Sequence, residues 1–150
     1  MAPLSFGIRE THLAACSPAR PVPIVAVADT ADPVQRYDGR LGPPPLTRLL
    51  SVPETMEFWR RLHGCDGQAG RWLLHRERDD PTRTEVVGWT GFASGGPVLP
   101  YRVVGGGHQP PLFTPNTDEQ RRRFGRRGQD IETAEEIRRV SQRSRPTDAR

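Results

Sequence analysis

The clearest hydrophobic pattern in the chain is the run at residues 21–28, which begins with prolines and continues as unbroken apolar, mostly β-branched residues. A run that is apolar throughout is typical of a strand buried on both faces, as in a parallel sheet covered by helices. Catalytic groups in such sheets lie just beyond the carboxyl ends of the strands. Asp29 and Asp32 occupy that position, and ordinary turn chemistry is the alternative interpretation of both.

The strongest helix signal lies at residues 51–64. Ser51 has the character of an N-cap, Glu54 completes a capping box, and Gly64 is suited to the C-terminal end. Apolar side chains recur at helical spacing and form the predicted buried face: Val52, Met56, Trp59 and Leu62.

Three further stretches predict strands. Residues 72–74 are a short apolar island typical of a sheet edge, and residues 84–90 and 98–104 read as full strands. Pro100 argues against a central position for the last of these, because proline has no N–H to give to a neighbouring strand.

The C-terminal part predicts one more helix, with Asp130 as N-cap and an apolar face that continues to about residue 142. We expect residues 1–20 to be an N-terminal lead-in, residues 21–142 to be the folded domain and residues 143–150 to be a disordered tail.

Composition adjusts this picture. The chain has 150 residues with 34% hydrophobic content, 16 prolines and 15 glycines, which suits one α/β domain with a thin core and much loop. The net charge is +4, and all 22 basic residues are arginine, scattered in a way that favours coding bias. No segment predicts a membrane span or a signal peptide, no metal-ligand spacing is present, and Cys16 and Cys65 can form one disulfide at most.

The most suggestive chemical feature follows the strand predicted at 98–104. Three glycines, residues 105–107, lead directly into His108. Glycine allows a backbone to turn sharply or to approach another segment closely, and imidazole titrates in the range needed for proton transfer. An exposed loop histidine is the alternative interpretation.

Taken in order, these segments resemble the second half of an α/β-hydrolase of the polyhydroxybutyrate depolymerase type, a family that includes feruloyl and acetylxylan esterases. The resemblance is carried by four stretches: residues 21–25 with 30–34, residues 51–65, residues 101–108, and residues 129–137. It implies a partial α/β-hydrolase fold, made of the C-terminal strands and helices of a mostly parallel sheet. The implied substrate is a polyester or an aryl or acyl ester, cleaved with no cofactor and no metal.

The resemblance assigns Asp32 as the acid and His108 as the base of a Ser-His-Asp triad, with Asp29 as second choice because the family has glycine there. In such a triad the carboxylate orients the imidazole, whose other nitrogen takes the proton of the serine hydroxyl. The sequence departs from the family in having no G-x-S-x-G motif. Ser5 lacks the leading glycine of that motif, and Ser94 comes after the acid and lacks the flanking pattern. We therefore expect the nucleophile half to lie upstream of Met1 and this chain to be inactive alone.

Two other functions remain as alternatives. The basic run at residues 121–127 could bind nucleic acid, although the acidic residues after it favour a solvated loop and helix start. A non-catalytic protein could also pair with a partner, or with itself, through an exposed sheet edge. The resembling family is commonly secreted, whereas this chain shows no export signal, so its compartment stays open.

Overall fold

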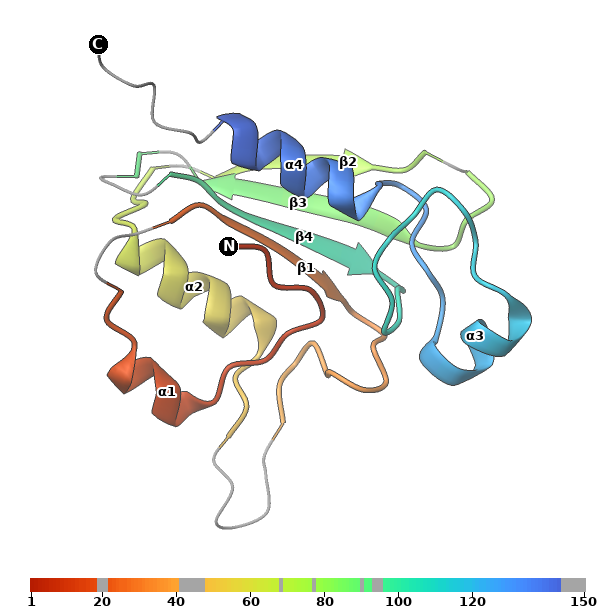
Figure 1. Cartoon of the computed structure of the whole chain (residues 1–150), viewed down its shortest axis with the longest axis horizontal. Helices are drawn as coiled ribbons and strands as arrows, with labels where there is room; N and C mark the ends of the chain where they lie inside the picture. The colour runs from red at the N-terminus through yellow and green to blue at the C-terminus, as the bar shows by residue number, and fades with distance from the viewer. Residues whose placement is uncertain are drawn as a thin grey trace.

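The computed structural model describes residues 1–18, 22–40, 48–67, 69–76, 78–89, 91–92 and 96–143. A four-stranded sheet forms the middle layer, with α1 (Glu10–Ala15) and α2 (Val52–Leu62) on one face and α4 (Thr133–Arg143) on the other (Figure 1). The α/β class expected from the sequence is therefore present.

The sheet has the order β1-β4-β3-β2, formed by β1 (Ile24–Asp29), β2 (Ala69–Leu74), β3 (Arg83–Trp89) and β4 (Val98–Val104). Only β1 and β4 are parallel, whereas β3 is antiparallel to both β4 and β2. The expectation of a mostly parallel sheet is thus corrected to a mixed sheet. The segments that join β2 to β3 and β3 to β4 are too short for a crossover helix, so these strands fold back as hairpins.

Strand β1 matches its sequence pattern. All six of its residues are buried, and it pairs in parallel with β4, as a continuous apolar run predicts. Its outer edge is covered by the N-terminal segment, where Leu4 forms a parallel bridge with Val27 and Ser5 N donates to Val27 O at 3.0 Å. The predicted lead-in at residues 1–20 is therefore partly an extension of the sheet.

Pro100 is tolerated in the central strand β4 because of the register. Pro97 O and Val103 O accept hydrogen bonds from β1 and the turn after it, so the odd-numbered residues of β4 face β1. Pro100 consequently faces β3, and the pairing with β3 covers Tyr101–Val104 only, so Pro100 lies one residue outside it. The missing N–H lies beyond the ladder and costs no strand hydrogen bond.

Helix α2 forms as predicted. Ser51 and Glu54 make a reciprocal capping box, and Gly64 follows the C-cap with φ of 62°. Val52, Met56 and Trp59 are buried against the Ile24 side of β1, which gives the sheet its first core. A row of apolar residues at helical spacing is sufficient to orient this helix.

Helix α4 begins later than predicted. It starts at Thr133, and Asp130 is not its N-cap, because Asp130 Oδ1 accepts a hydrogen bond from Arg76 N at 2.8 Å. Val140 and the preceding Ile131 pack with Val25 and Val27 on the opposite face of the sheet, forming the second core.

Two short helices escaped the sequence prediction. Helix α1 has no buried residue. Helix α3 (Asp118–Phe124) overlaps the first part of the basic run at residues 121–127, for which the sequence favoured a solvated loop and helix start. A capping box of Thr117 and Gln120 starts α3 and was a readable signal. Of the tail predicted at residues 143–150, Arg143 is the last residue of α4, and residues 144–150 lie outside the described part of the chain. No described helix has the length and apolar character of a membrane span.

Candidate functional site

The structure brings together the two residues that the sequence suggested as base and acid. His108 Nδ1 lies 2.8 Å from Asp32 Oδ2, although the residues are 76 positions apart. The Asp32 side chain is 1% exposed and the His108 side chain 31% exposed. A buried carboxylate thus holds one ring nitrogen, and the partly exposed ring leaves Nε2 as the nitrogen available to another group.

Asp32 is held by the turn that follows β1. Its Oδ1 accepts hydrogen bonds from Val34 N and Gln35 N, both at 2.7 Å. This arrangement combines the two interpretations that the sequence left open, because one oxygen serves the turn while the other serves His108. With both oxygens engaged, the carboxylate has a fixed orientation.

His108 is positioned by the glycines before it. Gly105 takes φ of 76°, which side chains other than glycine rarely adopt, and its N–H donates to Thr30 Oγ1 at 2.9 Å. A Cβ on Gly106 would lie 2.2 Å from Asp29 Oδ1, and one on Gly107 would lie 2.1 Å from Phe124 O. The loop therefore needs one glycine for its turn and two for close approach.

Two segments anchor the histidine loop through the backbone. On one side, Ala31 N donates to Gly106 O at 2.9 Å, which joins the His108 loop to the Asp32 turn. On the other side, His108 N donates to Phe124 O at 2.6 Å and Gly107 N donates to Arg126 O at 2.7 Å. No pattern of side chains indicates this second anchor, because the contacts are made by main-chain carbonyls.

Asp29, the second choice for the acid, does not contact His108. It is the last residue of β1, is 2% exposed, and both of its carboxylate oxygens lack a hydrogen-bond partner within the described part of the chain. Burial, with a smaller contribution from the negative charge of Asp32, raises the pKa of Asp29 to about 8. Asp29 is therefore mostly neutral at pH 7.

Ser5, one of the two serines considered from the sequence, does not join this pair. Ser5 is the one non-glycine residue with positive φ among the described residues, at 41°, and its recorded hydrogen bond runs to β1 and not to His108. Ser94 lies outside the described residues. In the described ranges no hydroxyl is hydrogen-bonded to His108.

The remaining histidine and cysteine residues lie elsewhere. His63 is buried at the end of α2, with Nδ1 3.1 Å from Gly96 O, and it takes no part in the pair. Cys16 and Cys65 are both free. Among the described residues no group of three or more metal-ligating side chains comes together, and the Asp32–His108 pair alone is too small a ligand set for a metal.

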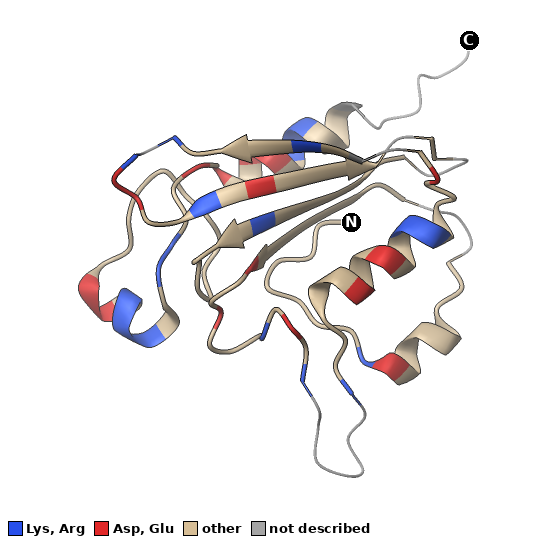
Figure 2. Ribbon diagram, turned by 180° about the vertical axis from the view of Figure 1, so that it is seen from behind, with Lys and Arg blue, Asp and Glu red and all other residues tan. Residues whose placement is uncertain are grey.

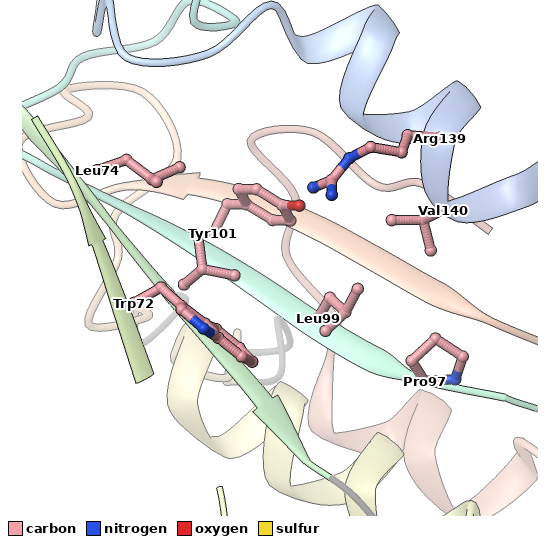
Figure 3. A pocket seen from close by; sticks show the side chains of 8 residues that line it. Trp72, Leu74, Pro97, Leu99, Tyr101, Arg139 and Val140 are labelled. Carbon is pink, nitrogen blue, oxygen red and sulfur yellow. The ribbon is translucent and has the colours of Figure 1, made fainter. Parts of the chain in front are cut away.

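Two cavities bear on what could approach the pair. One of about 740 Å³ is lined by Pro33 and Val34, directly after Asp32, and by Leu49 on the far wall. A second, apolar cavity of about 500 Å³ lies between α4 and the sheet, where Trp72, Leu99 and the Tyr101 ring line it (Figure 3). Asp32 and His108 line neither cavity, and the first is related to the site only because Pro33 and Val34 directly follow Asp32 in the chain.

Comparison with known proteins identifies no family. No family model matches the chain, and neither curated proteins nor solved structures give a match. Any role for the Asp32–His108 pair therefore rests on its geometry and on the resemblance of the sequence to esterases.

Proposed function

We propose that Asp32 and His108 are the acid and base of a carboxylic ester hydrolase of the polyhydroxybutyrate depolymerase type. The single observation that carries this proposal is the 2.8 Å contact between His108 Nδ1 and Asp32 Oδ2 at the carboxyl ends of two adjacent parallel strands. Asp32 and His108 are 76 positions apart, and the sequence suggested both as acid and base. They meet at the carboxyl ends of the strands, where catalytic groups of parallel sheets lie.

In this proposal the carboxylate of Asp32 accepts the Nδ1–H of His108 and leaves Nε2 unprotonated. Nε2 takes the proton of an attacking hydroxyl, and Asp32 stabilises the imidazolium that forms. Nε2 then returns the proton to the leaving alcohol. The His108 side chain is 31% exposed, so an ester can approach the ring from solvent.

The nucleophile is the part of the mechanism that these residues do not supply. The sequence has no G-x-S-x-G motif, and no described hydroxyl is bonded to His108. We therefore propose that the chain alone is an inactive fragment of the hydrolase. Hydrolysis of p-nitrophenyl butyrate by the purified chain should not exceed that of the His108→Ala variant, and turnover that His108→Ala abolishes would overturn this claim.

A second experiment tests the esterase assignment itself. The DNA upstream of the Met1 codon is translated in all frames, and any extension with a G-x-S-x-G motif is expressed joined to this chain. The extended protein should hydrolyse the ester, and Asp32→Asn should lower kcat by about 10⁴-fold. Asp29→Asn is the matched control and should keep at least a tenth of the activity. Absence of the motif, or activity indifferent to Asp32→Asn, would count against an esterase.

The alternative of a nucleic-acid-binding protein rests on the basic run at residues 121–127. In α3 the acidic Asp118 and Glu119 precede three arginines on the same short helix, and Arg121 lies 3.4 Å from Asp118. This mixture of charges favours the esterase proposal over a phosphate-backbone surface. Binding of duplex or single-stranded DNA that weakens steeply with salt would restore the alternative.

A further inference from the structure

A third cavity, separate from the Asp32–His108 pair, is built around arginine side chains. It has a volume of about 350 Å³ and lies between the segment after α3 and the turn before β3. Its walls combine three arginines with two aspartates and a few apolar and amide groups, and the lining residues used here are Arg121, Arg126, Arg127, Asp80, Phe113 and Pro115. Figure 2 shows the same concentration of charge, with basic residues at the end of α3 and again in the segment that follows.

Three positive and two negative side chains line this cavity, since Asp79 and Asp80 face the same space as the arginines. Arg121 has one exposed ion pair with Asp118 at 3.4 Å, whereas Arg126 and Arg127 have no ion pair among the described residues. The Asp80 oxygens accept from Thr82 and Gln129. The guanidinium groups of Arg126 and Arg127 are therefore not paired with a described carboxylate, and an added anion would be attracted to them.

Arg127 shows an unmet need for an acceptor. Its Nε is buried and has no hydrogen-bond partner in the described residues. Its Nη1 has only a long contact of 3.5 Å with Thr114 O. The buried Nε is closed to a ligand as it is to water, so an oxygen-rich group in the cavity would be held through the Nη donors of this side chain.

We propose that this cavity binds the oxyanion group of a small organic anion. Guanidinium groups recognise phosphate and carboxylate through paired N–H donors, which suits Arg126 and Arg127 to the anionic end of the ligand. Phe113 and Pro115 supply an apolar wall for the carbon part. The cavity is too small for a nucleic-acid duplex, so the ligand is a small molecule.

The site is coupled to the histidine loop by the backbone. Arg126 O accepts from Gly107 N at 2.7 Å, one residue before His108. An anion that orders the Arg126–Arg127 segment should therefore change the NMR chemical shifts of the amides of residues 107 and 108. This inference does not depend on the esterase proposal, since it predicts binding and not turnover.

The test is an NMR titration of the ¹⁵N-labelled chain with inorganic phosphate, phenyl phosphate and benzoate at constant ionic strength. We expect saturable shifts at the amides of Gly107, His108 and Gln129 with at least one probe. Saturation by phenyl phosphate alone assigns a phosphate ligand, and saturation by benzoate as well assigns any oxyanion. Either result supports the site, whereas no saturable shift with any of the three probes overturns it.

Paired variants locate the binding. Arg126→Gln with Arg127→Gln should weaken the bound probe at least tenfold, whereas Arg122→Gln with Arg123→Gln removes the same charge from exposed positions that do not line the cavity. Should the first pair fail to fold, as judged by circular dichroism, exposed Arg126→Gln alone should still weaken binding at least threefold. Equal weakening by variants at cavity and control positions would mean a diffuse basic surface and would overturn the proposal.

Discussion

Two carboxyl groups three residues apart at the end of β1 have opposite surroundings. Asp32 stands in the turn after the strand, where two backbone amides and His108 surround it. Asp29 is still within the strand, where the ladder engages its backbone and no described donor reaches its side chain. One carboxyl thus has hydrogen-bond partners for both oxygens, and burial raises the pKa of the other to about 8.

The comparison shows that a position in a turn, more than proximity to the end of a strand, allows a carboxylate to hold a histidine. A turn frees main-chain N–H groups to point at one oxygen, which leaves the second oxygen for a partner. A residue inside a strand has no such free donors, so its buried carboxyl keeps a proton instead.

The largest expected change in the free energy of unfolding is a gain in stability from Asp29→Asn. The folded-state pKa of Asp29 is raised, so the folded state holds a proton that the unfolded state loses above about pH 4. Stability should accordingly fall as the pH rises from about 4 towards 8, and Asn removes that fall, giving about 2 to 4 kcal/mol at pH 7. Urea unfolding of both proteins at pH 5 and pH 8 measures it. A variant less stable than the parent at pH 8 would contradict this view of Asp29.

Asp32→Ala should act in the opposite direction. It removes the acceptor of Val34 N and Gln35 N together with the partner of His108, so it should lower the free energy of unfolding by about 2 kcal/mol. Asp32→Asn keeps an oxygen for the two amides and should cost less. An Asp32→Ala protein as stable as the parent would show that the turn does not depend on this side chain.

Gly106→Ala probes how closely the histidine loop packs on Asp29. The new Cβ would lie 2.2 Å from Asp29 Oδ1 and 2.7 Å from Val103 Cγ1, which should cost roughly 1 to 3 kcal/mol. Gly105→Ala meets nothing closer than 3.6 Å and should cost about 1 kcal/mol through its positive φ alone. In an Asp29→Ala background the Gly106→Ala cost should shrink. Thermal unfolding of the parent, the two single variants and the double variant measures this coupling. An unchanged stability cost of Gly106→Ala would show that its clash is not with Asp29.

The smallest change in stability is expected at the far edge of the sheet, away from both carboxyls. Leu73 is 62% exposed on the edge strand β2. Leu73→Lys should alter stability by less than about 0.5 kcal/mol but should reduce self-association measured by light scattering. Ser141→Lys adds the same charge on α4 as control. Equal effects of the two variants would argue against pairing through this edge.

The parts of the fold that could be predicted are those fixed by nearby residues. The run at residues 21–28 and the Ser51–Glu54 capping box carry their structure locally, and β1 and α2 form as expected. The Asp32–His108 pair followed from a resemblance in the order of segments, and its contact is present.

What could not be predicted depends on distant partners. Asp130 has the chemistry of an N-cap, yet Arg76 N, 54 residues away, takes its oxygen. The antiparallel direction of β3 relative to β2 and β4 follows from the short segments that join these strands, and an apolar run alone does not indicate strand direction. The raised pKa of Asp29 arises from burial at the end of β1 and, to a smaller extent, from the charge of Asp32, and no spacing in the sequence reveals that burial.

The most direct test of the central claim is the tautomer of His108, read from ¹⁵N NMR of its ring nitrogens. The Asp32–His108 contact predicts a proton on Nδ1 and a bare Nε2 when the ring is neutral, in the parent and in Asp29→Asn alike. Asp32→Ala should move the proton to Nε2. A parent ring protonated on Nε2, or one unchanged by Asp32→Ala, would contradict the assignment of Asp32 and His108 as an acid–base pair.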